Sequence, residues 1–162
     1  MLSRTRRALP LVAISALILA CDDDGPDDDR YEASLRGSSE VPANDSDATG
    51  TAMFTDRGGS FEFRIDVQDI DFPFAAHIHA GAQGVNGGIL VPLFSTQNPE
   101  AAVSGTLVVD SFTAADIVPL TGATAAISMD SLRVLMRTGG AYVNVHTTDL
   151  PGGEIRGQIG PR

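Results

Sequence analysis

Two histidines stand two residues apart in the segment AHIHAG, and a third follows much later in the segment YVNVHTT. A β-strand projects alternate side chains to opposite faces, so His77 and His79 should point to the same side of one strand. Neutral imidazole nitrogens are ligands for Cu(II) and Zn(II), and copper binds more tightly in the ranking of divalent first-row ions. If the strand that carries His146 lies next to theirs, the three residues could hold one such ion.

Polar residues near His146 could orient metal-bound imidazoles by accepting the second N–H group of each ring. The candidates for this role are Asn144, Thr147, Asp149 and Glu154. The alternative is that the three histidines are structural groups, which hydrogen-bond across neighbouring strands or to loop carbonyls. Metal binding, unlike the structural role, requires the three imidazoles to converge on one point.

Glycine-rich segments follow both histidine segments, at residues 81–88 and 152–153. The chain contains no lysine and no helix is expected to start there, so these segments predict turns that need positive φ, not a phosphate-binding loop. Glu154 and Arg156 stand two residues apart in the last predicted strand. We therefore expect them to share a face and to form surface ion pairs with each other or with adjacent strands, and such a pair contributes at most about 1 kcal/mol.

From residue 31 onward, short runs of alternating apolar and polar residues are separated by Gly, Pro, Asn and Asp. This pattern is typical of an antiparallel all-β domain. The alternation is clearest over residues 60–69, and the Gly-Gly turn before them predicts a hairpin with residues 49–55. Further strands are predicted at residues 31–36, 75–80, 89–94, 102–110, 141–148 and 154–159.

Two short helices are predicted between these strands. Residues 113–116 resemble an N-capped turn, and residues 128–138 begin at the capping residue Ser128 and carry an apolar stripe. With these helices, seven or eight strands predict a single domain over residues 31–162, folded as a β-sandwich or a flattened Greek-key barrel.

The first twenty residues predict an export signal, because basic residues precede an apolar run that is too short to span a bilayer. The run ends in LILAC, which resembles a bacterial lipobox and contains Cys21, the only cysteine of the chain. That resemblance implies cleavage before Cys21 and its lipidation, and several acyl chains give stable anchoring. The alternative is an ordinary signal peptide with an unrelated cysteine.

Residues 21–30 are predicted to be the lipidated cysteine and an acidic, solvated tether, since six aspartates surround a Gly-Pro pair. The formal net charge of the whole chain is −10, so nucleic-acid binding is not expected. We expect the protein to be exported and lipid-anchored to a bacterial cell envelope, on its periplasmic or cell-surface face. Its expected partners are the membrane, through the anchor, and an envelope or extracellular protein.

The two histidine segments, AHIHAGAQGVNGGILVPLF and YVNVHTTDLPGGEIRGQI, resemble the paired signatures of the CHRD domain family. The resemblance covers residues 31–159. It implies an all-β module outside the cytoplasm that binds a partner and has no established catalytic activity.

The same segments also resemble the copper half of the copper/zinc superoxide dismutases, where a His-x-His strand precedes a glycine-rich loop. That resemblance implies copper ligands at His77, His79 and His146. The chain has no fourth histidine for a bridging ligand or a zinc site, so dismutase activity is not expected. The sequence therefore favours a non-catalytic binding module, with a mononuclear copper or zinc binding protein as the alternative.

Overall fold

The computed structural model describes residues 30–162 of the chain. The expected signal peptide at residues 1–20, the lipidation site Cys21 and most of the acidic tether lie outside these residues. Within the described part of the chain, no helix is both long enough and apolar enough to cross a membrane.

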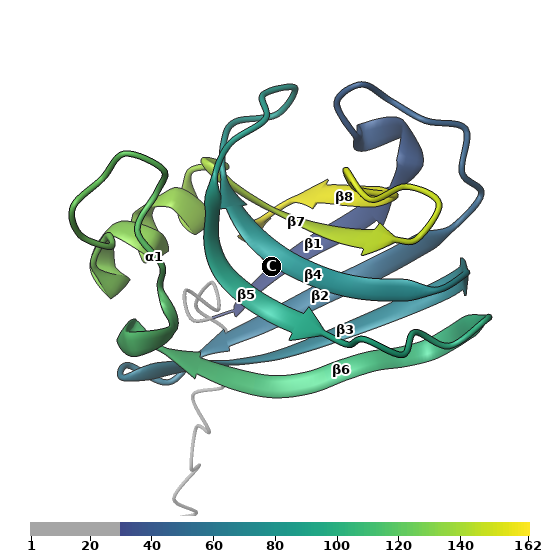
Figure 1. The fold of residues 1–162 in the computed structure, drawn as a ribbon. Coiled ribbons are helices and arrows are strands. Elements are labelled where there is room, and N and C mark those ends of the chain that lie inside the picture. Colours follow the sequence, from purple (N-terminus) through teal and green to yellow (C-terminus); the bar gives the residue numbers. More distant parts are fainter. Residues whose placement is uncertain (1–29) are drawn as a thin grey trace, which may run out of the picture.

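A single antiparallel sheet makes up most of the described chain (Figure 1). Its strands are β1 (Arg30–Arg36), β2 (Thr49–Asp56), β3 (Ser60–Ile70), β4 (Pro73–Ala80), β5 (Ile89–Ser95), β6 (Val103–Thr113), β7 (Ala141–Thr147), β8 (Ile155–Gln158) and the two-residue β9 (Gly160–Pro161). The strand order is β5-β4-β7-β8-β1-β2-β3-β6, with β9 paired to β1. Because β5 and β6 lie beside each other, the sheet curls into a nearly closed barrel, which confirms the predicted all-β fold.

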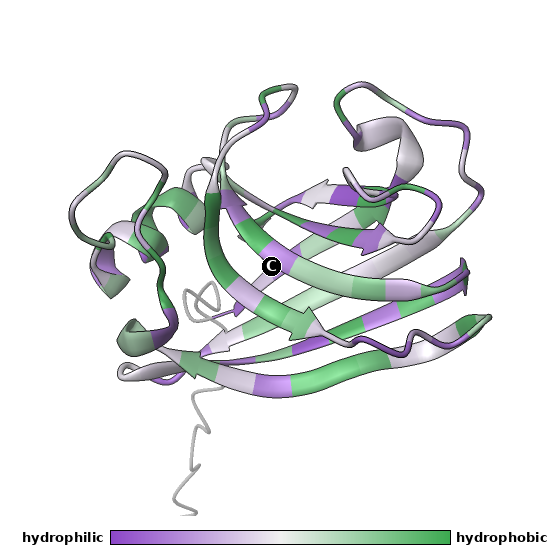
Figure 2. Ribbon diagram, in the orientation of Figure 1, coloured by the Kyte–Doolittle hydropathy of each residue, from purple (hydrophilic) through white to green (hydrophobic). Residues whose placement is uncertain are grey.

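The alternation of apolar and charged residues explains the predicted hairpin. In β3, the side chains of Phe61, Phe63 and Ile65 are at most 5% exposed, whereas Glu62 and Arg64 face solvent. Strands β2 and β3 pair in an unbroken antiparallel register, so the hairpin is confirmed. Figure 2 shows the same change between hydrophobic and hydrophilic positions along the strand.

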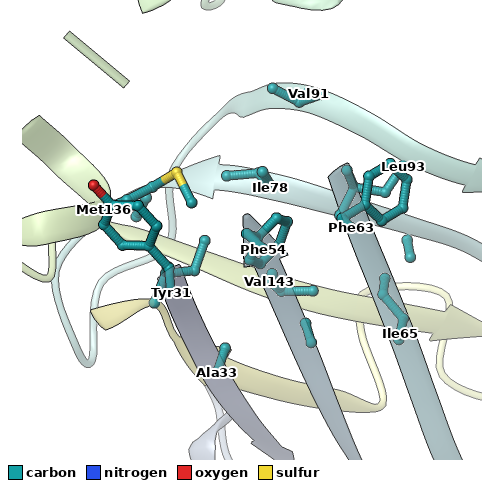
Figure 3. Packing of buried hydrophobic residues seen from close by; sticks show 14 of the residues in the cluster. Tyr31, Ala33, Phe54, Phe63, Ile65, Ile78, Val91, Leu93, Met136 and Val143 are labelled. Carbon is teal, nitrogen blue, oxygen red and sulfur yellow. The ribbon is translucent and has the colours of Figure 1, made fainter. Parts of the chain in front are cut away.

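The hydrophobic core lies inside the barrel, where strands from both halves of the sheet meet (Figure 3). Phe54 and Phe63 from the β2–β3 hairpin face Ile78 of β4 and Val143 of β7, and all four are buried. The core thus joins the histidine strands β4 and β7 to the rest of the barrel through their inward-facing residues.

Two of the three helices within residues 30–162 match the predicted ones. The 3-10 turn η2 (Ala114–Asp116) is capped by Thr113, and α1 (Met129–Arg137) begins after Ser128, whose Oγ accepts a hydrogen bond from the backbone N–H of Ser131 at 3.1 Å. The turn η1 (Gly37–Ser39) was not expected. Helix α1 packs against one end of the barrel through Leu132 and Met136.

An ion pair joins α1 to the β2–β3 hairpin. The Arg133 guanidinium donates to both carboxylate oxygens of Asp56, at 2.5 and 3.0 Å, and both side chains are largely shielded from solvent. The hydrogen bonds from Arg133 lower the pKa of Asp56, the chief opposing influence being partial burial of the carboxylate.

We expect Arg133→Met to lower the free energy of unfolding by about 1–3 kcal/mol, because the Asp56 carboxylate would lose its charged donor in a half-buried position. Urea unfolding at pH 7 measures the change. The control is Arg137→Met, which removes an exposed guanidinium from the same helix and should stay within about 0.5 kcal/mol of wild type. Equal losses in both variants would contradict the assigned role of Arg133.

Candidate functional site

The three histidines lie on the outward face of neighbouring strands. In the antiparallel pairing of β4 with β7, His77 stands opposite Asn144 and His79 stands opposite Tyr142. In the pairing of β7 with β8, Asn144 stands opposite Arg156. Directly paired residues point to the same side of a sheet, so these side chains share the face opposite to the core. We call them the polar layer: His77, His79, Tyr142, Asn144, His146 and Arg156.

Loops cover the polar layer, although a face of this composition would be expected to lie in solvent. The exposed fractions are 8% for His79, 3% for Asn144, 9% for His146 and 2% for Arg156. The loops at residues 81–88 and 148–153 accept hydrogen bonds from the layer, and the loop at residues 37–47 is joined to the first of them, because Asn86 Nδ2 donates to the Val41 carbonyl at 2.7 Å. Every residue of β7 is consequently buried, on the core side and on the outer side alike.

The three imidazoles converge, as the metal hypothesis requires. One ring nitrogen from each of His77, His79 and His146 lies within 4.8 Å of the others. The closest pair is His77 Nδ1 and His146 Nε2, at 3.1 Å. This pair is also hydrogen-bonded across adjacent strands, as expected if the histidines have a structural role.

Backbone carbonyls of two covering loops set the tautomers of two imidazoles. His79 Nδ1 donates to the Gly87 carbonyl at 2.9 Å, and His146 Nδ1 donates to the Pro151 carbonyl at 2.9 Å. In a neutral ring, the other nitrogen then carries a lone pair. His146 Nε2 accepts from His77, whereas His79 Nε2 is buried without a hydrogen-bond partner.

Burial keeps all three imidazoles neutral near neutral pH. Desolvation, with smaller contributions from His146 and His79, lowers the pKa of His77 to about 4. Burial also lowers the pKa of His79 and of His146, and their hydrogen bonds to loop carbonyls oppose this shift only in part. Neutral imidazoles are the form that binds metal ions, so protons compete weakly for this site.

Gly87 fits only as glycine, because a Cβ atom there would lie 1.5 Å from the Ala80 carbonyl oxygen. Its N–H donates to the Tyr142 hydroxyl at 3.2 Å, and its carbonyl accepts from His79. The Tyr142 ring in turn stacks on the His79 imidazole, with 5.0 Å between the centroids. The glycine-rich run therefore positions His79 closely against Tyr142.

The expected surface ion pair between Glu154 and Arg156 is wrong. Glu154 precedes β8, so strand alternation does not place it beside Arg156. Its carboxylate accepts hydrogen bonds from the hydroxyls of Ser46 and Thr147, both at 2.6 Å. The buried Arg156 guanidinium stacks on Tyr142, 3.4 Å from the ring centroid, and donates to loop 81–88, including the Val85 carbonyl at 2.8 Å.

The remaining orienting candidates have different positions. Thr147 accepts from the Leu150 N–H at 3.2 Å and binds Glu154, so both act on the loop that carries Pro151. Asn144 stands opposite His77 in the β4–β7 pairing, on the same face of the sheet as His79, and its Oδ1 is buried without a hydrogen-bond partner. Asp149 is exposed at the start of the turn, directly after Thr148.

Sequence reasoning missed the carbonyls of Gly87 and Pro151, the stack of Arg156 on Tyr142, and Glu40. Carbonyl groups occur in every residue and leave no signal in a sequence. The position of Tyr142 could have been inferred, because it alternates with His146 along one predicted strand.

Glu40 is a buried acid at the edge of the polar layer, 8% exposed. Burial raises the pKa of Glu40 to about 7, although the Arg156 charge and the Val41 N–H both lower it. A Cβ atom on Gly153 would lie 2.5 Å from Glu40 Oε1 and 2.8 Å from Asn144 Nδ2. The absent side chain of Gly153 therefore lets these two groups approach each other.

The raised pKa of Glu40 predicts that the free energy of unfolding falls as the pH rises. The unfolded chain releases this proton near pH 4.5 and the folded chain holds it until about pH 7, so Glu40 lowers stability as the pH rises through that window. We expect Glu40→Gln to be more stable than wild type at pH 8, by about 1–3 kcal/mol, and nearly equal to it at pH 4.5.

Thermal and urea unfolding at both pH values measure this difference. The control is Glu100→Gln, which changes an exposed carboxylate and should follow the wild type at each pH. A Glu40→Gln variant with the same pH dependence as wild type would refute the ionisation of a buried Glu40.

Comparisons with known proteins identify the family of the chain. No curated protein matched the sequence. The family model described as the CHRD domain matches residues 31–159, which contain strands β2 to β8, all of β1 except Arg30, and every residue of the polar layer. The matched segment includes both histidine segments and the three loops that cover them, and the chain therefore belongs to the CHRD domain family.

Proposed function

We propose that this protein is an exported, lipid-anchored binding protein of the cell envelope, with a non-catalytic role. Membership of the CHRD family supports the binding role. The basic and apolar N-terminal run that ends at Cys21 supports export and anchoring. An envelope or extracellular protein is the partner class that fits this position.

A specific observation favours a second function, the binding of one Cu(II) or Zn(II) ion. His79 Nε2 is a buried lone pair without a partner, and it belongs to a cluster of three neutral imidazoles. Two nitrogens bound to one tetrahedral ion at 2.0–2.1 Å are about 3.3 Å apart. The 3.1 Å separation of His77 Nδ1 and His146 Nε2 fits this value, and binding would require His77 to carry its proton on Nε2.

Carbonyl groups that orient metal-bound histidines are a common feature of metal sites. In this chain the carbonyls of Gly87 and Pro151 would have that role, and their loops would hold the ligands in position before the ion binds. An all-nitrogen ligand set suits copper and zinc better than Mg²⁺ or Ca²⁺, which prefer oxygen.

The anchor is tested with Cys21→Ser. We expect this variant to move from the membrane fraction to the soluble fraction of the envelope, because the thiol that carries the lipid is lost. Fractionation followed by immunoblotting measures the distribution. Membrane retention equal to wild type would refute lipidation at Cys21.

The metal site is tested by calorimetric titration of the purified protein with Cu(II) and with Zn(II). We expect one ion per chain, and His79→Phe should weaken binding by about 100-fold or more, since it removes a ligand. Phenylalanine keeps an aromatic ring against Tyr142, so the fold should persist, as circular dichroism would verify.

Asp110→Ala is the control for weak binding to surface carboxylates, which are abundant in this acidic chain. It should leave the affinity unchanged. If the wild type takes up neither ion, or if His79→Phe binds as well as the wild type, the metal function is refuted and the proposal of a binding module stands alone.

A further inference from the structure

The polar layer and its edge contain several buried side-chain atoms without a hydrogen-bond partner. Among residues 30–162, four buried side-chain atoms have no hydrogen-bond partner, and one of them is the Tyr31 hydroxyl in the core. The other three gather at the candidate site: His79 Nε2, Asn144 Oδ1 and Glu40 Oε1. Leaving a buried polar atom unpaired costs about 1–3 kcal/mol, so such a concentration points to a ligand that pairs with these atoms.

Asn144 is placed to act beside the three histidines. It stands directly opposite His77 in the β4–β7 pairing and lies on the same face of the sheet as His79. Its Nδ2 atom lies on the side of Gly153 and Glu40. The amide is therefore turned with Nδ2 toward the covering loop, and its unpaired Oδ1 remains for the site.

We propose that the ion held by His77, His79 and His146 carries one water molecule as its fourth ligand, and that Asn144 Oδ1 accepts a hydrogen bond from this water. The inference rests on the metal-binding function proposed above. An ion alone would satisfy His79 Nε2 and leave Asn144 Oδ1 unpaired. An ion with its water satisfies both, because the ion binds the nitrogen lone pair and the water supplies the donor.

This arrangement distinguishes between oxidation states of copper. Zn(II) and Cu(II) take a fourth ligand when a protein supplies three imidazoles, and water is the usual one. Cu(I) is satisfied by three imidazoles in a plane and holds water weakly. Asn144 is thus a positioning residue that strengthens binding of divalent ions and leaves binding of Cu(I) unchanged.

The experiment compares the wild-type protein, purified in detergent from expressing cells, with Asn144→Leu. Competition titrations with chromophoric chelators give affinities for Zn(II), Cu(II) and, under reducing anaerobic conditions, Cu(I). We expect Asn144→Leu to weaken Zn(II) and Cu(II) binding by about 10-fold or more and to change Cu(I) binding by less than about 2-fold. Asn98→Leu, at a surface loop, is the matched control and should change none of the three.

A second measurement needs no variant. The Cu(II)-loaded wild type should enhance solvent proton relaxation by the amount that one coordinated, exchanging water gives. No coordinated water would overturn the proposal, and so would an equal loss of Cu(I) and Cu(II) affinity in Asn144→Leu. These outcomes leave the metal site itself in place, whereas failure of the wild type to bind any of the three ions would overturn both.

Discussion

The burial of β7 on both faces is the constraint on which the rest of the site depends. A strand in a small antiparallel barrel usually has one face in the core and one in water. In β7 the outer face carries Tyr142, Asn144 and His146, and three loops take the place of water there. Each polar atom under those loops needs a partner from the protein, because an unpaired buried group costs free energy. The loops at residues 81–88 and 148–153 are accordingly bound to the layer through backbone carbonyls, which accept from two imidazoles and the guanidinium.

This dependence works in both directions. The loop at residues 81–88 accepts hydrogen bonds from His79 and Arg156, so its conformation holds those side chains and is held by them. Glycine at position 87 is required by the close approach of the Ala80 carbonyl, and glycine at position 153 by the approach of Glu40 and Asn144. A segment that looks like an ordinary flexible turn in the sequence is thereby fixed by side chains from two strands. Such mutual support is how proteins hold groups in position before a ligand arrives.

Much of the barrel could be predicted from the sequence, because its signals are local. Alternation in β3, the Gly-Gly turn before it and the cap at Ser128 each depend on neighbouring residues only. The meeting of His77, His79 and His146 could also be inferred, from strand alternation in two similar segments. The burial of Arg156 could not, since its partners are carbonyls of a loop seventy positions away and carry no distinctive residue type. Glu40 was missed for the same reason: an acid in a polar loop gives no sign that two other loops will cover it.

Strand β1 connects the end of the barrel where the described termini meet to the loop at residues 37–47. This strand begins at Arg30, where the backbone carbonyl accepts a hydrogen bond from the N–H of Arg162, so both ends of the described chain meet there. It ends at Arg36, about 20 Å away for seven extended residues, and leads into the loop at residues 37–47 that covers the polar layer. A protein attached to any surface through the N-terminal side of Arg30 would stand on that end of the barrel. The loop at residues 37–47, which follows Arg36, would then lie about the length of β1 away from the point of attachment.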